Sequence, residues 1–171
     1  MRNARGIANA VLALVILPAA MASAQQEVTI SPGTSLSGGA SFGGPLGASV
    51  MGEVLWGLGA DVREDGEHVR GRAGVLFQLH AGSGGGKLSV GLGGRARIDS
   101  DDLKGAVTAG LKVSVARTWG SPVGTAENLT YLGPELDLSV MRVALSLGAL
   151  WRVDGSGGKG VLFSWGLGFR L

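Results

Sequence analysis

Few side chains in this sequence could act as acids, bases or metal ligands. His68 and His80 are the only histidines among the 171 residues, and cysteine is absent. The absence of thiols excludes disulfides and a cysteine nucleophile. His68 lies in a charged stretch next to Glu67, which is typical of a solvated side chain. The Gly-rich run GSGGGK (residues 82–87) lacks the spacing and the strand-to-helix context of a phosphate-binding loop.

Charged residues form a larger set, and most of them recur at every second position of alternating segments. This spacing puts them on the polar face of the segments that carry them, where they could form ion pairs or line a polar path. The members of the set are Glu53, Asp61, Arg70, Arg72, Arg95, Arg97, Lys112, Glu135, Asp137, Arg142, Arg152 and Arg170.

The segments that position these side chains are predicted strands. Helices are disfavoured because 32 glycines recur through the chain, and each costs a helix ~1 kcal/mol relative to alanine. Turn sequences such as REDGE, GSGGG and DGSGG separate the alternating segments. Short turns predict an antiparallel meander, and an even number of strands allows it to close and remove its edges. The eight predicted strands cover residues 34–43, 48–62, 68–81, 87–98, 106–119, 131–140, 142–153 and 161–171.

The two histidines fall on one predicted strand, residues 68–81, near its opposite ends. A metal site would need both rings in one place, so the sequence predicts no metal centre and no cofactor.

The N-terminus has the features of a secretory signal peptide. Arg2 and Arg5 precede a short apolar run, residues 11–17, and Ala22-Ser23-Ala24 offers small residues for cleavage. The run is too short to cross a membrane as a helix. We therefore expect residues 1–24 to be removed, residues 25–32 to form a short N-terminal segment, and residues 33–171 to form one barrel domain.

Removal of residues 1–24 takes away two of the 15 basic residues and none of the 13 acidic ones. The mature chain then has no formal net charge, and it contains no basic block. Nucleic acid is therefore not an expected partner.

Alternation alone fits both a soluble barrel with an apolar interior and a membrane barrel with a polar interior. Here glycine and serine dominate the polar face, and such small residues suit the narrow interior of eight strands. The apolar face is nearly free of charge, with Arg117 near a strand end as the exception. The sequence therefore predicts an all-β, eight-stranded antiparallel transmembrane β-barrel, a meander with short turns and a polar interior.

The last strand carries a motif at the C-terminus. Ser164, Gly166, Phe169 and Leu171 resemble the C-terminal β-signal of bacterial outer-membrane proteins, in which a polar residue and a glycine precede two hydrophobic residues. The mature chain is similar in architecture to the small eight-stranded OmpA/OmpX-type barrels of Gram-negative bacteria. The resemblance implies a location in the bacterial outer membrane with a periplasmic N-terminus, contact with outer-membrane lipid and lipopolysaccharide, and recognition by the barrel-assembly machinery. Only residues 120–129 exceed a turn, which counts against a loop-based receptor or adhesin role.

Aromatic residues fall near the two ends of the predicted barrel. Trp119, Trp151 and Phe163 are expected near one rim and Phe169 near the other, as in the interfacial girdles of such barrels. Trp56 lies nearer the middle of its strand and fits this pattern less well.

Three functions are compatible with a polar interior. Inward charges must be paired or hydrated, so the favoured interpretation is a structural, non-enzymatic membrane protein whose lumen is plugged by salt bridges. The first alternative is a narrow, porin-like channel for small solutes or ions. The charges expected to form the lumen network are Glu53, Arg72, Arg95, Lys112, Glu135 and Asp137.

The second alternative is a lipid A-modifying enzyme. Lipid A deacylases of similar architecture use a closely spaced histidine and serine with an acidic partner, and HAGSGGG supplies His80 and Ser83. No acidic residue lies nearby in the sequence, so an inward rim histidine beside an ordinary turn serine is the favoured interpretation.

Overall fold

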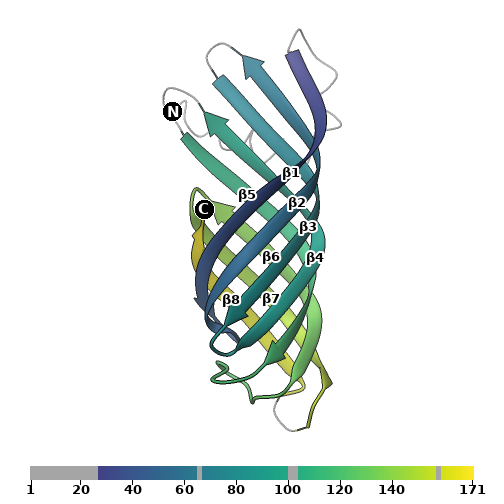
Figure 1. Ribbon diagram of the computed structural model, residues 1–171, viewed down its shortest axis with the longest axis vertical. Coiled ribbons are helices and arrows are strands. Elements are labelled where there is room, and N and C mark those ends of the chain that lie inside the picture. Colours follow the sequence, from purple (N-terminus) through teal and green to yellow (C-terminus); the bar gives the residue numbers. More distant parts are fainter. Residues whose placement is uncertain (1–26, 65–66, 100–103, 157–158) are drawn as a thin grey trace.

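The computed structural model describes residues 27–64, 67–99, 104–156 and 159–171, and the fold is all-β (Figure 1). Each strand pairs antiparallel with the next, and β1 pairs with β8 to close the barrel. The predicted antiparallel meander of eight strands is confirmed, whereas the expected signal peptide, residues 1–24, lies outside the described residues. The strands are β1 Glu27–Gly43, β2 Gly47–Glu64, β3 Glu67–Gly82, β4 Gly85–Asp99, β5 Lys104–Thr118, β6 Thr130–Val140, β7 Val143–Asp154 and β8 Val161–Arg170.

Strand β1 begins earlier than its alternation pattern indicates. Residues 27–32, part of the segment 25–32 that was expected to precede the barrel, pair with β2 from Glu27↔Arg63 to Pro32↔Leu58 and belong to β1. Pro32 cannot donate a backbone hydrogen bond, and it lies where β1 has no described partner on its β8 side. The ladder with β2, rather than the local pattern of β1, therefore determines where this strand starts.

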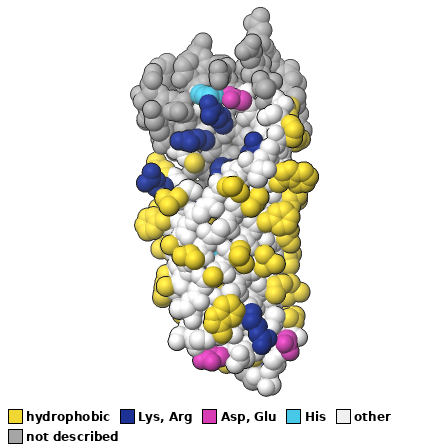
Figure 2. All heavy atoms as spheres, in the orientation of Figure 1, with side chains coloured by type: hydrophobic (Ala, Val, Ile, Leu, Met, Phe, Trp, Pro, Cys, Tyr) yellow, Lys and Arg dark blue, Asp and Glu magenta, His cyan; other side chains and the backbone are white. Residues whose placement is uncertain are grey.

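The polarity of the barrel is inverted relative to a water-soluble protein. Large apolar side chains point outward around the ring and are exposed, including Trp56, Leu92 and Leu111 at 61%, 68% and 64%. Figure 2 shows such residues along the outside of the ring. The alternate positions point inward, and Glu53, Lys112 and other charged residues are buried there.

The strands differ in length, and this difference gives the barrel two unlike ends. We call the end with the turns at residues 44–46 and 83–84 and the segment 119–129 the loop end, and the end with residues 141–142 and Leu171 the terminal end. Strands β1 to β5 have 15 to 18 residues, whereas β6, β7 and β8 have 11, 12 and 10. At the terminal end β1 to β5 therefore continue past the ring as an open sheet, visible at the top of Figure 1.

Closure depends on a short seam between β1 and β8. Only four residue pairs join the two strands, from Gly39↔Arg170 to Phe42↔Leu167. The amide of Leu171 extends the seam by donating to the carbonyl of Gly38 (2.8 Å). A Cβ built on Gly39 would lie 2.1 Å from the carbonyl oxygen of Phe169, so the two backbones approach closely here.

Five inward-facing glycines form a row across the first five strands. The register places Gly33, Gly57, Gly74, Gly93 and Gly110 opposite one another on β1 to β5. A Cβ on Gly57 would lie 2.1 Å from the carbonyl oxygen of Ala73, and a Cβ on Gly74 would lie 2.1 Å from that of Trp56. At these two positions no side chain fits without a backbone shift, so the glycines allow the strands to approach closely around the lumen.

We expect Gly57→Ala to destabilise the barrel by about 1–3 kcal/mol, because the added methyl group collides with backbone that cannot move freely. Gly52→Ala is the matched control on the same strand, since a Cβ on Gly52 meets nothing within 4 Å. Urea-induced unfolding, followed by tryptophan fluorescence, measures both variants. Equal stability of the two variants would contradict the role given to the glycine row.

Candidate functional site

The candidate site is the lumen, where inward side chains form one polar network. The network is built by β1, β2, β3, β4, β5, β6 and β8, so the barrel must close before it can form. Its charged members are Glu53, Lys87, Arg95, Lys112, Glu135, Asp137 and Arg170.

Glu135 on β6 is the centre of one half of the network. Its Oε1 accepts hydrogen bonds from the Lys87 ammonium group (2.9 Å) and from the Ser164 hydroxyl (2.6 Å). The Ser114 hydroxyl donates to the second oxygen, Oε2. The side chain of Glu135 is fully buried and that of Lys87 is 4% exposed, so this ion pair is shielded from solvent. A buried carboxylate with three donors has replaced its lost hydration.

Arg170 on β8 joins the two carboxylates of the other half. Its Nη2 lies 2.5 Å from Asp137 Oδ2 and 3.0 Å from Glu53 Oε2. The amide nitrogen of Gln78 lies between the same carboxylates, at 2.7 Å from Asp137 and 2.5 Å from Glu53. One arginine and one glutamine thus hold two acidic groups together that would otherwise repel each other.

Two further cations complete this half. Arg95 donates to Glu53 Oε1 (2.8 Å) and to the hydroxyls of Ser35 (2.9 Å) and Ser37 (2.7 Å) on β1. The Lys112 ammonium group donates to the side-chain oxygen of Gln78 and lies 3.7 Å from Asp137 Oδ2. The whole network thus contains three carboxylates and four cations, which leaves one formal positive charge in excess.

Apolar side chains also fill part of the lumen. Towards the loop end lies a buried apolar cluster of Ala116, Leu129, Tyr131, Leu150 and Leu162. Across that end, the amides of Trp119, Ser121 and Val123 donate to the carbonyls of Gly84, Ser83 and Pro45, so the segment 119–129 is bound to the two short turns. Leu55 and Leu76 are buried in the interior beside the glycine row. The network is therefore covered at the loop end, whereas at the terminal end Arg95 and Arg170 line a cavity at the mouth of the ring.

Five of the six expected network residues, Glu53, Arg95, Lys112, Glu135 and Asp137, are brought together in the lumen. Arg72 is the exception among the described contacts. Its guanidinium nitrogen Nη1 donates to the carbonyl of Gly57 (3.4 Å), and the group lies over Gly33 and Gly59. The Arg72 guanidinium group therefore occupies the space beside these glycines and lies outside the network.

Three participants were missing from the expected network. Gln78 is uncharged, Lys87 lies near the start of β4, and Arg170 lies at the end of β8. Their positions in the alternating pattern could have identified them, because all three lie on the polar face of their strands and therefore point inward. Their reach across the lumen depends on the stagger between strands, which the alternation does not specify.

Among the described hydrogen bonds, none joins His80 to Ser83, the two residues considered for enzyme chemistry. His80 is buried, and its Nε2 lies 3.4 Å from the side-chain oxygen of Gln78. Ser83 is exposed in the turn between β3 and β4. His68 lies towards the terminal end, with its Nε2 2.5 Å from Asp61 Oδ1. Within the described residues, no group of three or more potential ligands could hold a metal ion.

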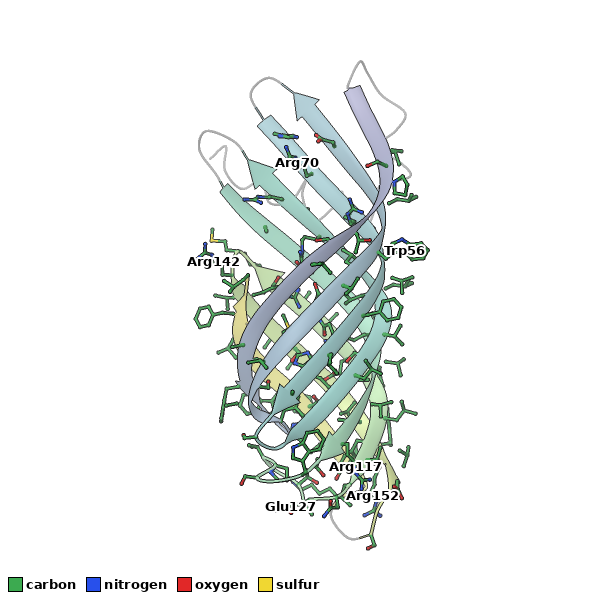
Figure 3. All side chains as sticks on the ribbon, in the orientation of Figure 1. Trp56, Arg70, Arg117, Glu127, Arg142 and Arg152 are labelled. Carbon is green, nitrogen blue, oxygen red and sulfur yellow. The ribbon has the colours of Figure 1, made fainter. Side chains whose placement is uncertain are left out.

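The aromatic residues lie at both ends of the ring, and one of them was misjudged. Trp151 pairs with Val161 near the loop end, where Trp119 and Phe163 also lie, whereas Phe169 pairs with Val143 at the terminal end. In Figure 3 Trp56 lies at about the height of Arg142 along the long axis, level with the terminal rim of the ring. Because β2 continues beyond the ring, the middle of this strand coincides with that rim.

The residues of the C-terminal motif have distinct environments. Ser164 points into the lumen and donates to Glu135, and Gly166 is buried next to the Ser146 hydroxyl. Phe169 and Leu171 point outward and are 66% and 83% exposed. The motif thus combines two small lumen-facing residues with two apolar residues on the outer surface.

Comparison with known proteins gives no relative: no family model, no curated protein and no solved structure matches this chain. Among the described residues, no helix has the length and apolar character needed to cross a membrane.

Glu135→Gln should destabilise the barrel by about 3–5 kcal/mol, because it leaves the ammonium group of Lys87 buried without its carboxylate. The combined change Lys87→Met and Glu135→Gln should recover part of this loss, since it removes the unpaired charge.

The matched control is the exposed ion pair between Arg117 and Asp154 (3.3 Å) at the loop end. Asp154→Asn should cost no more than about 1 kcal/mol. Unfolding midpoints in urea compare the variants. A loss for Glu135→Gln no larger than that for Asp154→Asn would show that the network does not stabilise the barrel.

Proposed function

We propose that this chain is an integral β-barrel protein of the bacterial outer membrane, with a structural, non-enzymatic role and a closed lumen. The observation that carries the proposal is the inverted polarity of the ring: exposed Leu, Val, Trp and Phe side chains surround a buried network of ion pairs. In water, this barrel would expose a contiguous apolar surface far larger than soluble monomers do. In a bilayer, the same surface would contact lipid chains.

Strand length supports the same proposal. A tilted strand needs about 9–11 residues to cross the hydrocarbon core, and β6, β7 and β8 have 11, 12 and 10. The aromatic residues at the two rims of the ring fit the two interfaces of a bilayer. In this arrangement the terminal end and the open sheet lie in the periplasm, and the loop end faces outward.

The filled lumen supports a structural role over a channel. The apolar cluster with Tyr131, the ion-pair network and the leucines beside the glycine row fill the interior. Water and ions would have to displace all three to pass. The proposed partners are outer-membrane lipid and lipopolysaccharide around the ring, and the barrel-assembly machinery, for which the final strand carries the recognition motif.

The surroundings of His80 favour a non-enzymatic role over lipid A modification. The ring contacts a glutamine rather than a carboxylate, and Ser83 lies in the turn. An enzyme of this kind needs a base that an acidic group orients towards the nucleophile.

Membrane insertion predicts a depth-dependent cost of outward charges. Leu111→Arg, at the middle of β5, should destabilise the barrel in lipid vesicles by about 2–4 kcal/mol, and Val153→Arg, near the end of β7, by about 0–1 kcal/mol. Both residues are exposed, at 64% and 59%. Reversible urea unfolding in phosphatidylcholine vesicles measures the difference. A soluble barrel would tolerate both changes, so equal, near-zero costs would overturn the proposal.

If the lumen is closed, the barrel should not conduct ions in planar bilayers. The refolded chain, residues 25–171, should insert without discrete current steps, and its heat-sensitive migration on gels verifies that it is folded. Reproducible steps from the wild-type protein would replace the structural role with the channel. Lys112→Ala should then alter ion selectivity, because it removes a charge from the lumen.

A further inference from the structure

We infer that the terminal end of the barrel carries a binding site for a phosphate group. A cavity of about 490 Å³ opens there, at the mouth of the ring, where the network ends. Its volume is within the range of small-molecule sites. The polar residues that line it are Arg95, Arg97, Arg142, Arg170, Thr108 and Ser139.

The charged side chains that line this cavity are all arginines. No described lining residue has an acidic side chain. The Arg97 and Arg142 side chains are exposed, and neither makes an ion pair within the described residues. Figure 2 shows basic side chains gathered at this end of the molecule.

Arg170 supplies a second, independent observation. It is only 5% exposed, yet its Nε and Nη1 atoms are buried without a hydrogen-bond partner, while Nη2 alone contacts Glu53 and Asp137. Unpartnered buried donors on a charged group are costly, so Arg170 favours a further hydrogen-bond acceptor beside it. Arg170 lines the cavity at the point where the lumen network meets it.

The number of free charges favours a dianion over a carboxylate. Arg97 and Arg142 have no described partner, and the network below contributes one further positive charge in excess. A phosphate monoester carries about −1.5 to −2 charges at pH 7, and arginine binds its oxygens in a planar, bidentate manner. The Thr108 and Ser139 hydroxyls, both buried, can donate to the remaining oxygens. The ligand is therefore a phosphorylated small molecule or the phosphate of a lipid headgroup.

Calorimetric titration of the full chain with inorganic phosphate, in a neutral maltoside detergent at low salt, tests the site. We expect saturable binding that Arg97→Gln and Arg142→Gln each weaken about tenfold, the loss typical of one charge-assisted contact. Arg117→Gln is the matched control, since it removes the same charge from the loop end and should alter affinity less than twofold.

A second arm distinguishes the two sources of phosphate. The same variants are unfolded in phosphatidylcholine vesicles with and without phosphatidylglycerol. Protection by phosphatidylglycerol that depends on Arg97 and Arg142, without binding of free phosphate, would support the site and assign it to a lipid headgroup. Binding of free phosphate with the same dependence would assign it to a soluble ligand.

The inference is overturned if neither arm responds to Arg97→Gln or Arg142→Gln, or if Arg117→Gln has the same effect as they do. Heat-sensitive gel migration shows in parallel that each variant is folded. Because the detergent arm needs no membrane and no conductance, a failure there leaves the proposed membrane-barrel function standing.

Discussion

Charges inside an eight-stranded ring must be satisfied by other inward side chains, because the interior is only wide enough for side chains to fill. Most features of this barrel follow from that constraint. Glu135 is satisfied by a lysine and two serines, and Glu53 and Asp137 share Arg170 and Gln78. These partners come from different strands, so an error in the register of one strand would break several contacts at once. The network therefore selects the closed ring over partly paired alternatives.

The glycines are the counterpart of the large inward side chains. Gly148 lies against Glu135, where an added Cβ would come within 2.4 Å of the glutamate Cγ. Gly93 and Gly110 lie under Leu76, and Gly33 lies under the guanidinium group of Arg72. At these positions a glycine provides the space that a large inward side chain of a neighbouring strand occupies. This complementarity accounts for part of the glycine content of the strands.

The alternation of the sequence was enough to predict the number and order of strands, because each strand has one polar and one apolar face. It also placed Glu53, Glu135 and Asp137 on the inner face. It could not determine which inward residues meet, since that depends on how far each strand is staggered against the next. Lys87 shows the difficulty: its register partner across the sheet is Ala116, whereas its ion-pair partner across the lumen is Glu135.

Local reasoning also missed features that only the neighbouring strand determines. Residues 27–32 carry a proline and little alternation, yet they pair with β2 and extend β1 beyond the ring. Trp56 lies in the middle of its strand in the sequence but at the rim of the ring in space, because β2 is longer than β6, β7 and β8. In both cases the position of a residue along the barrel has to be measured against the closed ring, whose height is determined by its shortest strands.

The unequal strand lengths connect the lumen with the terminal end. If all eight strands had the length of β2, the wall would continue around the cavity beside Arg95 and Arg170 and would have to fill or bury it. Because β6, β7 and β8 stop early, the last positive groups of the network lie next to an open mouth instead. Arg95 is 20% exposed there, whereas the carboxylate that it contacts, Glu53, is fully buried. The excess positive charge of the network can thus be placed at the one level where solvent or an anion can reach it, which is where an unbalanced charge costs least.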